Sequence, residues 1–274
     1  PLHAGGWKDT DLDGLVDEWP QGCDDQCQTD SGLLIDPFTD DSDNDGVSNA
    51  DDHDDNGDGM VDIDADSDGL IDVANLLQLN AMRHQLNGQG YRGSSAAELN
   101  LSGCPFIVYQ AVYQQRCLGY ELITDLDFDT NQDGQMDSED TYWNSSEGWL
   151  PVGDTFEAFS SIFDGNGHTI RNLYINRAQS DDIGLFGLID QAQIRQLGLD
   201  GPLMSITGGD AVGALAGYVK SASRIIDSYS TGPVKGDHPV GGLLGLMLND
   251  NQITNSYSTA DVHGAYYVGG LVGS

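Results

Sequence analysis

Residues 129–140, DTNQDGQMDSED, carry oxygen-bearing side chains at a spacing suited to holding a cation. Counted from Asp129, these side chains stand at positions 1, 3, 5, 9 and 12, with glycine at position 6 and a backbone carbonyl available at position 7. The segment contains five acids and no positive charge, so alone in water it should repel itself and stay disordered. It therefore predicts a divalent-cation site with these ligands: Asp129, Asn131, Asp133, Gln135, Asp137 and Asp140.

The ligand order matches an EF-hand-type calcium loop, in which glycine permits a sharp turn and oxygens converge on a hard ion. One position departs from that pattern. Asp140 stands at position 12 in place of the usual bidentate glutamate, so a lower affinity is expected. The competing interpretation is an acidic, solvated turn that binds nothing.

Four further segments in residues 1–72 repeat the pattern, with Val47, Met60 and Leu70 at the carbonyl position. Their predicted ligands are Asp9, Asp11, Asp13 and Asp17; Asp41, Asp43, Asp45, Val47, Asn49 and Asp52; Asp54, Asn56, Asp58, Met60 and Asp62; and Asp64, Asp66, Asp68, Leu70 and Asp72. Three loops lack an acid at position 12, where Pro20, Ala65 and Asn75 stand, so other segments or water must complete them. We expect about five calcium ions, without which this region has almost no core.

The charge of the chain excludes one class of partner. Among 274 residues there are 45 acids and 10 Lys or Arg, a formal net charge of -35. Nucleic acid is excluded as a partner because phosphate binding needs a basic surface. No apolar run approaches the ~20 residues that span a bilayer, so no direct membrane insertion is expected. The chain shows no signal peptide and begins at Pro1, so we expect that a leader or upstream domain has been removed.

The four cysteines form two close pairs, Cys23 with Cys27 and Cys104 with Cys117. Neither pair has the company of histidines or further cysteines that a zinc site needs. We therefore predict two local disulfides in an oxidising compartment, with free thiols as the alternative. Weak calcium loops fit the same setting, because extracellular calcium is millimolar.

The elements that position these residues change character at residue 73. VANLLQLNAMRHQLNG predicts a helix over 73–87, capped by Asp72 and ended by Gly88. After residue 148 the chain becomes short β segments, and VGALAG, VGGLLG and VGGLVG recur at equal intervals, starting at 212, 240 and 268. Equal periods of strand-like sequence predict a β-solenoid in which each coil buries its apolar face against the next. The predicted domains are thus 1–72, a calcium-loop region, and 73–274, the solenoid with its capping helix, disulfide loop 104–117 and inserted loop 129–140.

Two related segments, IIDSYSTGPV and ITNSYSTADV, predict the side-chain faces of one sheet. Strict alternation places Ile253, Asn255 and Tyr257 on one face, and Ile253 belongs inside. We therefore expect Asp227 and Asn255 to stack as an internal polar ladder beneath Tyr229 and Tyr257.

These repeats resemble the GLUG motif of bacterial surface proteins, including the non-catalytic part of IgA-cleaving peptidases. YELITDLDF and FDGNGHTIRNLYI resemble the entry coils that precede such repeats, and the aspartate-rich first quarter is similar to thrombospondin type-3 repeats. The resemblance covers nearly the whole chain. It implies an all-β fold, a right-handed parallel β-helix, in a secreted or surface-attached bacterial protein that continues into further domains.

Catalytic motifs give little support to an enzyme. None of the six histidines stands in an HExxH motif, and no GxSxG elbow or phosphate loop is present. The best catalytic candidates are Asp164 and His168, because β-helix polysaccharide lyases and hydrolases use carboxylates, but a turn-shaping role is favoured. The four tryptophans (Trp7, Trp19, Trp143 and Trp149) are expected to fill cores rather than stack on sugars.

The sequence as a whole favours a non-enzymatic, calcium-rigidified extracellular stalk or adhesin segment. Its solenoid would attach to a cell surface or matrix through glycans or another surface protein. Two alternatives remain open: a carbohydrate-active β-helix enzyme, and a non-catalytic part of a secreted peptidase.

Overall fold

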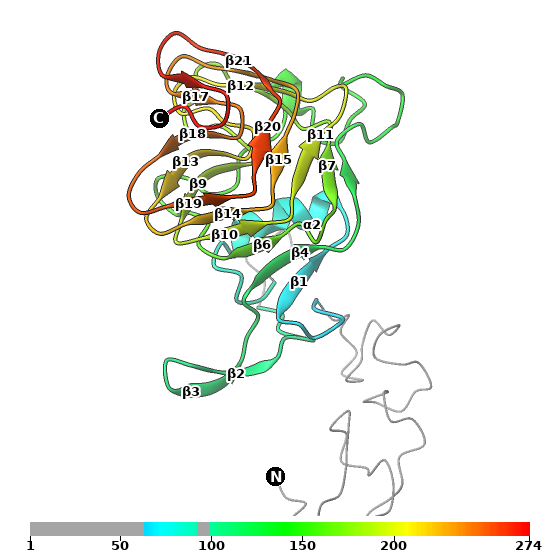
Figure 1. The fold of residues 1–274 in the computed structure, drawn as a ribbon. Helices are drawn as coiled ribbons and strands as arrows, with labels where there is room; N and C mark the ends of the chain where they lie inside the picture. The colour runs from blue at the N-terminus through cyan, green and yellow to red at the C-terminus, as the bar shows by residue number, and fades with distance from the viewer. Residues whose placement is uncertain (1–62, 92–98) are drawn as a thin grey trace, which may run out of the picture. The chain divides into compact units, whose positions relative to one another are not determined.

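The computed structural model describes residues 63–91 and 99–274. They fall into two compact units, one of residues 63–69 and 101–115 and the other of residues 70–91, 99–100 and 116–274. The second unit is a parallel β-solenoid with one short α-helix, which confirms the predicted fold class (Figure 1). Its first strand begins at Leu70, slightly before the predicted domain boundary.

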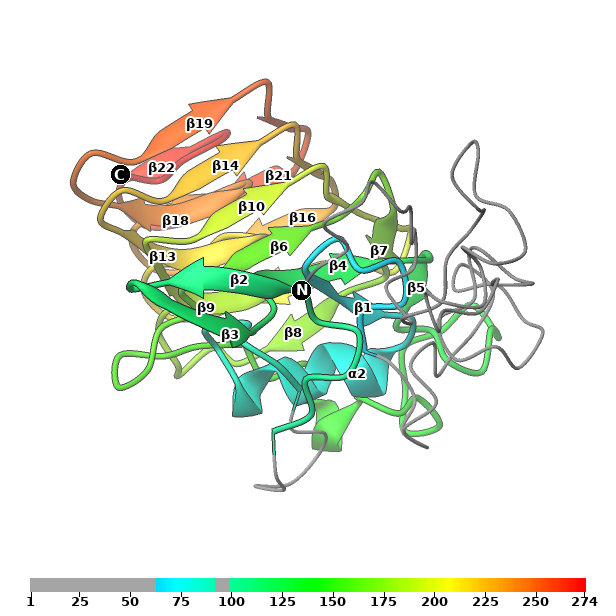
Figure 2. The same cartoon turned by 90° about the horizontal axis from the view of Figure 1, so that it is seen from below.

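The solenoid sheets run along the stack, and each coil adds one parallel strand to them. Figure 2 shows this stacking most clearly for β6, β10, β14 and β19. The first sheet contains β1 (Leu70–Val73), β4 (Gly119–Leu122), β6 (Ile162–Asp164), β10 (Gln193–Arg195), β14 (Arg224–Ile226) and β19 (Gln252–Thr254). The second contains β5 (Leu126–Asp127), β7 (Thr169–Arg171), β11 (Gly198–Asp200), β15 (Tyr229–Ser230) and β20 (Tyr257–Ser258).

The remaining faces of each coil are built in the same way. The third sheet contains β8 (Tyr174–Asn176), β12 (Ser205–Thr207), β16 (Pro233–Lys235) and β21 (Asp261–His263). The fourth contains β9 (Phe186–Asp190), β13 (Ala216–Lys220) and β18 (Leu244–Met247), and a two-stranded sheet pairs β17 (Val240–Gly241) with β22 (Val268–Gly269).

The predicted period holds for the last coils and lengthens toward the amino end. Ile225 pairs with Ile253, one predicted period later, whereas the interval from Ile194 to its partner Ile225 is slightly longer. The interval from Tyr120 to its partner Phe163 is much longer, because the acidic segment 129–140 and a 3-10 turn (η2, Asn144–Ser146) are inserted in that coil. The insertion leaves the parallel register of β4 and β6 intact.

The core consists of apolar side chains stacked in register from coil to coil. Phe163, Ile194 and Ile225 occupy equivalent positions, and each is at most 1% exposed. Burying such a side chain contributes about 1.5–3 kcal/mol. Glycine is needed where coils come closest: a Cβ on Gly213 would lie 2.6 Å from the backbone nitrogen of Gly245 in the next coil.

The predicted internal ladder of Asp227 and Asn255 is wrong. Both residues have positive φ, at 49° and 50°, and both side chains are exposed. A left-handed residue between two strands interrupts the alternation of side chains, so the phase on which the prediction depended is reset there. Tyr229 and Tyr257 instead stack on the outer face, with ring centroids 5.3 Å apart.

Serines take the inner positions that the prediction gave to Asp227 and Asn255. Ser228 is 1% exposed, and its hydroxyl accepts the backbone N–H of Leu197 and donates to the carbonyl of Ile226. Ser230 is fully buried, and its hydroxyl donates to the carbonyl of Gly242. Each buried hydroxyl is therefore satisfied by backbone.

The predicted helix is shorter and starts later than expected. Residues 70–73 pair with β4 as strand β1, so Asp72 lies inside a strand and cannot cap a helix. Asn75 is the N-cap, and its side chain accepts the N–H of Gln78 at 3.0 Å. The helix α2 (Leu76–Ala81) and the 3-10 turn η1 (Met82–His84) follow, at the amino end of the solenoid (Figure 1). Leu79 and Met82 are fully buried there.

A β-hairpin of strands β2 (Phe106–Tyr109) and β3 (Val112–Gln115) belongs to the first unit. Its two-residue turn, Gln110 and Ala111, has positive φ at both positions, as hairpin turns require. Val108 and Tyr113 pair across it, and both side chains are largely exposed, at 71% and 70%. No helix in the described part of the chain is long and apolar enough to cross a membrane.

Candidate metal loops and a polar pocket

The loop at 129–140 is folded by hydrogen bonds from its backbone to its own carboxylates. Asp129 accepts the N–H groups of Asp133 and Gly134, at 3.2 and 3.0 Å. Asp140, at the far end of the loop, accepts the N–H groups of Thr130 and Asp137, at 2.8 and 3.0 Å. These two acids, at positions 1 and 12, are both buried and hold the two ends of the loop together.

The other predicted ligands of this loop lie nearer the solvent. Asn131 and Asp133 are exposed, and Asp137 is half-buried. Each side chain accepts the backbone N–H of the residue two positions later in the sequence. Asn131 accepts that of Asp133 at 3.0 Å, Asp133 that of Gln135 at 2.9 Å, and Asp137 that of Glu139 at 2.9 Å. One oxygen of each side chain thus shapes the backbone.

The loop that starts at Asp64 has the same internal pattern. Asp64 accepts the N–H of Gly69 at 2.9 Å, as Asp129 accepts that of Gly134. Asp66 accepts the N–H of Asp68 at 3.2 Å, as Asn131 accepts that of Asp133 in the later loop.

The backbone conformations of the two loops agree as well. Position 4 has positive φ in both, 55° at Ser67 and 59° at Gln132, and so does the glycine at position 6. Two segments that are far apart in the sequence therefore adopt one loop conformation, as their common spacing predicted.

The donor set of both loops fits a hard divalent cation. In the Asp64 loop, one oxygen from each of Asp64, Asp66 and Asp68 lies within 4.8 Å of the others. Carboxylates this close repel one another unless protons or a cation compensate their charge. Oxygen ligands of this kind suit calcium rather than zinc or copper. Leu70 and Asp72, the remaining predicted ligands, lie in β1, where they pair with Gly119 and Glu121.

Other predicted ligands lie outside the described residues. These are Asp9, Asp11, Asp13, Asp17, Asp41, Asp43, Asp45, Val47, Asn49, Asp52, Asp54, Asn56, Asp58, Met60 and Asp62. Cys23, Cys27, Trp7 and Trp19 lie outside them too. Predictions on these positions remain predictions.

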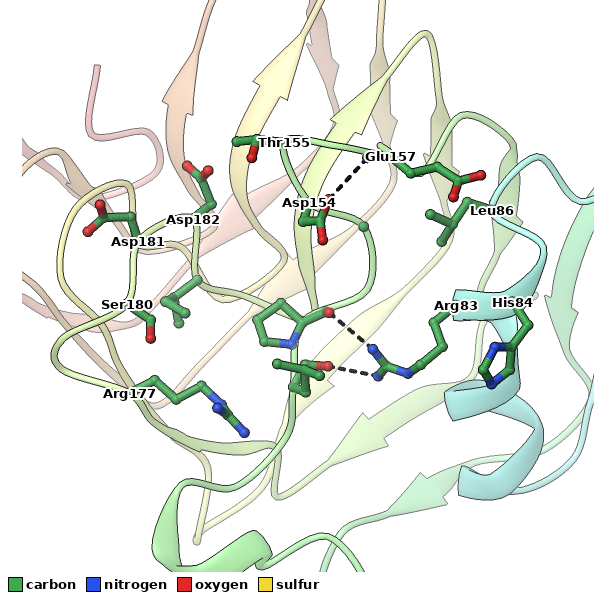
Figure 3. A pocket seen from close by; sticks show the side chains of 14 residues that line it. Arg83, His84, Leu86, Asp154, Thr155, Glu157, Arg177, Ser180, Asp181 and Asp182 are labelled. Atoms are coloured by element: carbon green, nitrogen blue, oxygen red, sulfur yellow. Dashed lines mark hydrogen bonds between the residues drawn. The ribbon is translucent and has the colours of Figure 1, made fainter. Parts of the chain in front are cut away.

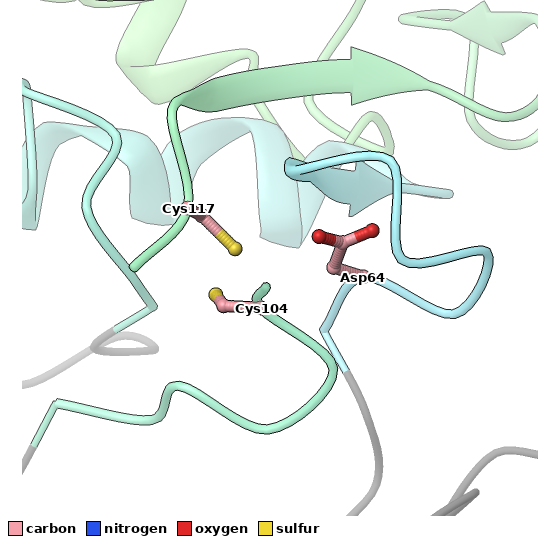
Figure 4. Close-up of side chains that lie close together, drawn as sticks. All are labelled: Asp64, Cys104 and Cys117. Carbon is pink, nitrogen blue, oxygen red and sulfur yellow. The ribbon is translucent and has the colours of Figure 1, made fainter. Parts of the chain in front are cut away.

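Cys104 and Cys117 are disulfide-bonded, as predicted (Figure 4). Oxidised sulfur is not a thiolate and does not serve as a metal ligand. The role of this disulfide is to close the segment of the chain that carries the hairpin.

The residues of the catalytic alternative have separate partners. Asp164 is 6% exposed, forms an ion pair with Arg195, and accepts the N–H of Asn166 at 2.8 Å. His168 contacts Asp125, with Nδ1 and Oδ1 3.1 Å apart. The pKa of Asp125 is lowered, first by the hydrogen bond from the N–H of Thr169. Asp164 has the contacts of a turn-shaping residue.

The two described tryptophans pack against protein. Trp149 is fully buried, and its indole N–H donates to the carbonyl of Leu185 at 3.0 Å. Trp143 stacks on Tyr174 with centroids 5.2 Å apart. Trp149 agrees with the expectation that tryptophan fills the core, whereas Trp143 is half-buried and packs on Tyr174.

A pocket of about 470 Å³ lies in the solenoid unit, and the sequence did not indicate it (Figure 3). Arg83 and His84 contribute one side, and a loop from Asp154 to Glu157 and a turn from Ser180 to Ile183 contribute others. These segments are far apart in the sequence, and each is short and without a motif. Only the stacking of coils brings them together, so no local spacing could have revealed the site.

The comparisons with known proteins give partial matches. No family model matches the chain. Over 99 residues, 35% of this chain, it is 38% identical to halomucin of Haloquadratum walsbyi, and over 72 residues, 26% of the chain, it is 42% identical to a "Putative Gly-rich membrane protein" of Evansella cellulosilytica. These matches span 1% and 8% of the two relatives' own lengths.

One solved structure is similar in part. It is described as a "putative immunoglobulin A1 protease" from Bacteroides ovatus, and it aligns with 74% of this chain and 52% of its own at 19% identity and a TM-score of 0.43.

Proposed function

We propose that the chain is a non-enzymatic, calcium-rigidified extracellular segment whose β-solenoid serves attachment to a cell surface or matrix. The observation that supports this most directly is the common conformation of the loops at Asp64 and Asp129. A conformation that recurs at two distant places with the same ligand spacing indicates a common ligand.

The residues present determine how calcium would act. Asp64, Asp66 and Asp68 would hold one ion, and Asp129, Asn131, Asp133, Asp137 and Asp140 another. A bound calcium ion supplies positive charge that offsets the repulsion among these carboxylates. The hydrogen bonds of Asp129 and Asp140 already bring the two ends of their loop together, so less ordering would remain to be done on binding.

The chemistry of the cysteines and the relatives' names support the proposed location. A disulfide persists in an oxidising compartment. Two relatives are a halomucin and a protein described as a Gly-rich membrane protein. The disulfide and the names of these two relatives are consistent with a secreted or surface-attached location, where calcium is abundant.

The non-enzymatic part of the proposal draws on the contacts of Asp164. A general acid must be free to exchange a proton with substrate. Asp164 is instead buried against Arg195 and a backbone N–H.

Small-angle scattering and calorimetric titration test the proposal together. Calcium should bind with a stoichiometry of several ions, and its removal should change the dimensions of the particle. Identical scattering curves with calcium and with chelator would contradict it. So would depolymerisation of a polysaccharide by the wild-type chain that is abolished in Asp164→Ala.

A further inference from the structure

The pocket at Arg83 has two chemically different kinds of wall. Leu86, Leu150, Pro151 and Ile183 supply apolar surface. Carboxylates and hydroxyls stand around them, from Asp154, Thr155, Glu157, Ser180, Asp181 and Asp182. In Figure 3, Asp181 and Asp182 lie on one side, Arg83 and His84 on the other, and Asp154 between them. A ligand for this pocket needs an apolar face together with many hydrogen-bond donors.

The two arginines in the wall are committed to the protein. Arg83 donates to the carbonyl of Leu150 at 2.9 Å and to the side chain of Asn80 at 2.9 Å, and its guanidinium lies 5.3 Å from the Trp149 ring. Arg177 donates from Nε to the carbonyl of Trp149 at 3.0 Å and from a terminal nitrogen to Glu147 at 2.8 Å. Their positive charge therefore serves to hold the chain between residues 147 and 151.

The groups left for a ligand are mainly acceptors. Asp154 uses one oxygen to accept the N–H groups of Phe156 and Glu157, and its other oxygen has no such role. Asp182 is half-buried, and burial and the neighbouring Asp181 raise its pKa. An acidic ligand would meet repulsion here, whereas hydroxyl or amino groups would find acceptors.

An exposed phenylalanine belongs to the loop that lines this pocket. Phe156 is 97% exposed, and Thr155 and Glu157 on either side of it line the pocket. The turn that carries it is held by the two hydrogen bonds to Asp154, at 2.7 and 3.0 Å. A phenylalanine presented to water on a fixed turn offers a ready surface for stacking by an apolar ligand face.

We propose that this pocket binds a saccharide, specifically a neutral or amino sugar and not a uronic acid. The C–H face of a pyranose would pack on Phe156 and the apolar wall, and its hydroxyls would donate to Glu157, Asp181 and Asp182. This deepens the attachment part of the proposed function, on which it rests, by naming the class of ligand. Among the residues that the structure describes, none that lines the pocket is a predicted calcium ligand.

A polar row leads from the pocket along the solenoid. Asp181 accepts the N–H of Asp210 in the next coil at 2.9 Å, and His238 in the coil after that lies 3.2 Å from the Asp210 carboxylate. Tyr266 follows, edge-on to the His238 ring at 6.4 Å and 69% exposed. Parallel strands are about 4.8 Å apart, so this row extends about 14 Å from Asp181. A linear oligosaccharide should therefore bind more tightly than its monosaccharide.

The test titrates the full chain, loaded with calcium, with three sets of oligosaccharides: neutral hexose oligomers, N-acetyl-hexosamine oligomers and uronate oligomers. Binding of a member of the first two sets is expected, and uronates should not bind. Phe156→Ala should lower the affinity roughly tenfold. Asp182→Asn should lower it several-fold, and Tyr266→Ala should weaken only the longer oligomers. Tyr113→Ala removes an aromatic ring on the hairpin that is 70% exposed, against 69% for Tyr266. It is the matched control and should leave the affinity unchanged.

Two results would overturn this assignment. One is the absence of binding at millimolar concentration for all three sets. The other is a saccharide affinity that Phe156→Ala and Asp182→Asn both leave unchanged. The titration is repeated with chelator: saccharide binding that persists while scattering shows no calcium effect would contradict the calcium proposal alone. A calcium effect on the scattering curve without saccharide binding would contradict the saccharide proposal alone.

Discussion

The regular coils and the acidic loops are ordered by opposite kinds of interaction. In the coils, side chains such as Val212, Leu215 and Leu243 are fully buried, and each strand pairs with strands of the neighbouring coils. In the loop at 129–140, the buried side chains are Asp129 and Asp140, and their hydrogen bonds stay within the loop. The coils should therefore be indifferent to ions, whereas the loops should depend on them.

The largest expected effect is on the coil core. Phe163 is fully buried, with its ring 5.5 Å from that of Phe186. Phe163→Ala should lower the free energy of unfolding by about 3–5 kcal/mol, because it removes packed atoms and leaves a cavity. Denaturant unfolding should show the same loss with calcium and with chelator. Phe156→Ala, at a 97% exposed position, is the control and should change stability by less than about 0.5 kcal/mol. A loss of stability seen only with calcium, or only with chelator, would contradict the expectation that the coils fold independently of ions.

The complementary effect is on the loop at 129–140. Asp129→Ala removes a predicted ligand and the acceptor for Asp133 and Gly134. At a calcium concentration one hundred times the dissociation constant, a bound ion contributes about 2.7 kcal/mol, which the variant should lose. Hydrogen exchange of the amides of residues 130–140 should become as fast as in the wild-type chain with chelator. Asp261→Ala, an exposed aspartate in the last coil, should exchange as the wild type does. Calcium-independent protection of this loop would refute the prediction.

A smaller effect is expected where coils meet most closely. In Gly213→Ala the new Cβ would lie 2.6 Å from the Ala216 carbonyl oxygen and from the Gly245 nitrogen. Backbone cannot move away as a side chain would, so we expect a loss of about 1–3 kcal/mol. Thermal unfolding measures it. Gly270→Ala is the control, since nothing lies within 4 Å of its Cβ position. Equal melting temperatures for the two variants would show that coil spacing adapts more easily than the packing indicates.

The smallest effect concerns pH and Asp182. Its pKa is raised, first by burial and then by Asp181. A carboxyl with a raised folded pKa stabilises the fold at low pH, and this contribution is lost as pH rises through the folded value. Asp182→Asn should therefore raise the melting temperature slightly at neutral pH and leave it nearly unchanged near pH 3.5, below the unfolded pKa of about 3.9. Asp237→Asn, at an exposed position, is the control. A lower melting temperature at neutral pH would contradict the sign.

Much of the fold could be predicted from the sequence because its information is periodic. The spacing of Val212, Val240 and Val268 indicated the coil, and the structure pairs these residues in sequence. The common spacing at Asp64 and Asp129 likewise indicated a common loop conformation. Whether an ion occupies it depends on affinity, which neither spacing nor hydrogen bonds measure.

The two wrong predictions, the internal ladder and the start of the helix, have a physical cause too. Alternation assumes that successive residues are extended, and the positive φ at Asp227 and Asn255 breaks it. The helix prediction used the apolar period from Val73 onward. It could not foresee that Leu70–Val73 would pair with β4, a strand far along the sequence. The pocket at Arg83 depends on contacts of the same long range, such as that of Arg83 with Leu150.

The tolerance of the coil for insertion has a consequence for engineering. Tyr120 and Phe163 keep the pairing that Ile225 and Ile253 have, although a much longer stretch of chain separates the first pair than the second. Hydrogen bonds from the N–H of Thr130 to Asp140 and from the N–H of Thr141 to Thr130 join the two ends of the added chain. Lengthening a loop with joined ends costs little closure entropy. The corner after Asp127 is therefore a natural grafting position. A foreign segment whose ends lie close together could replace 129–140 and be displayed there, while the rest of the solenoid folds as before.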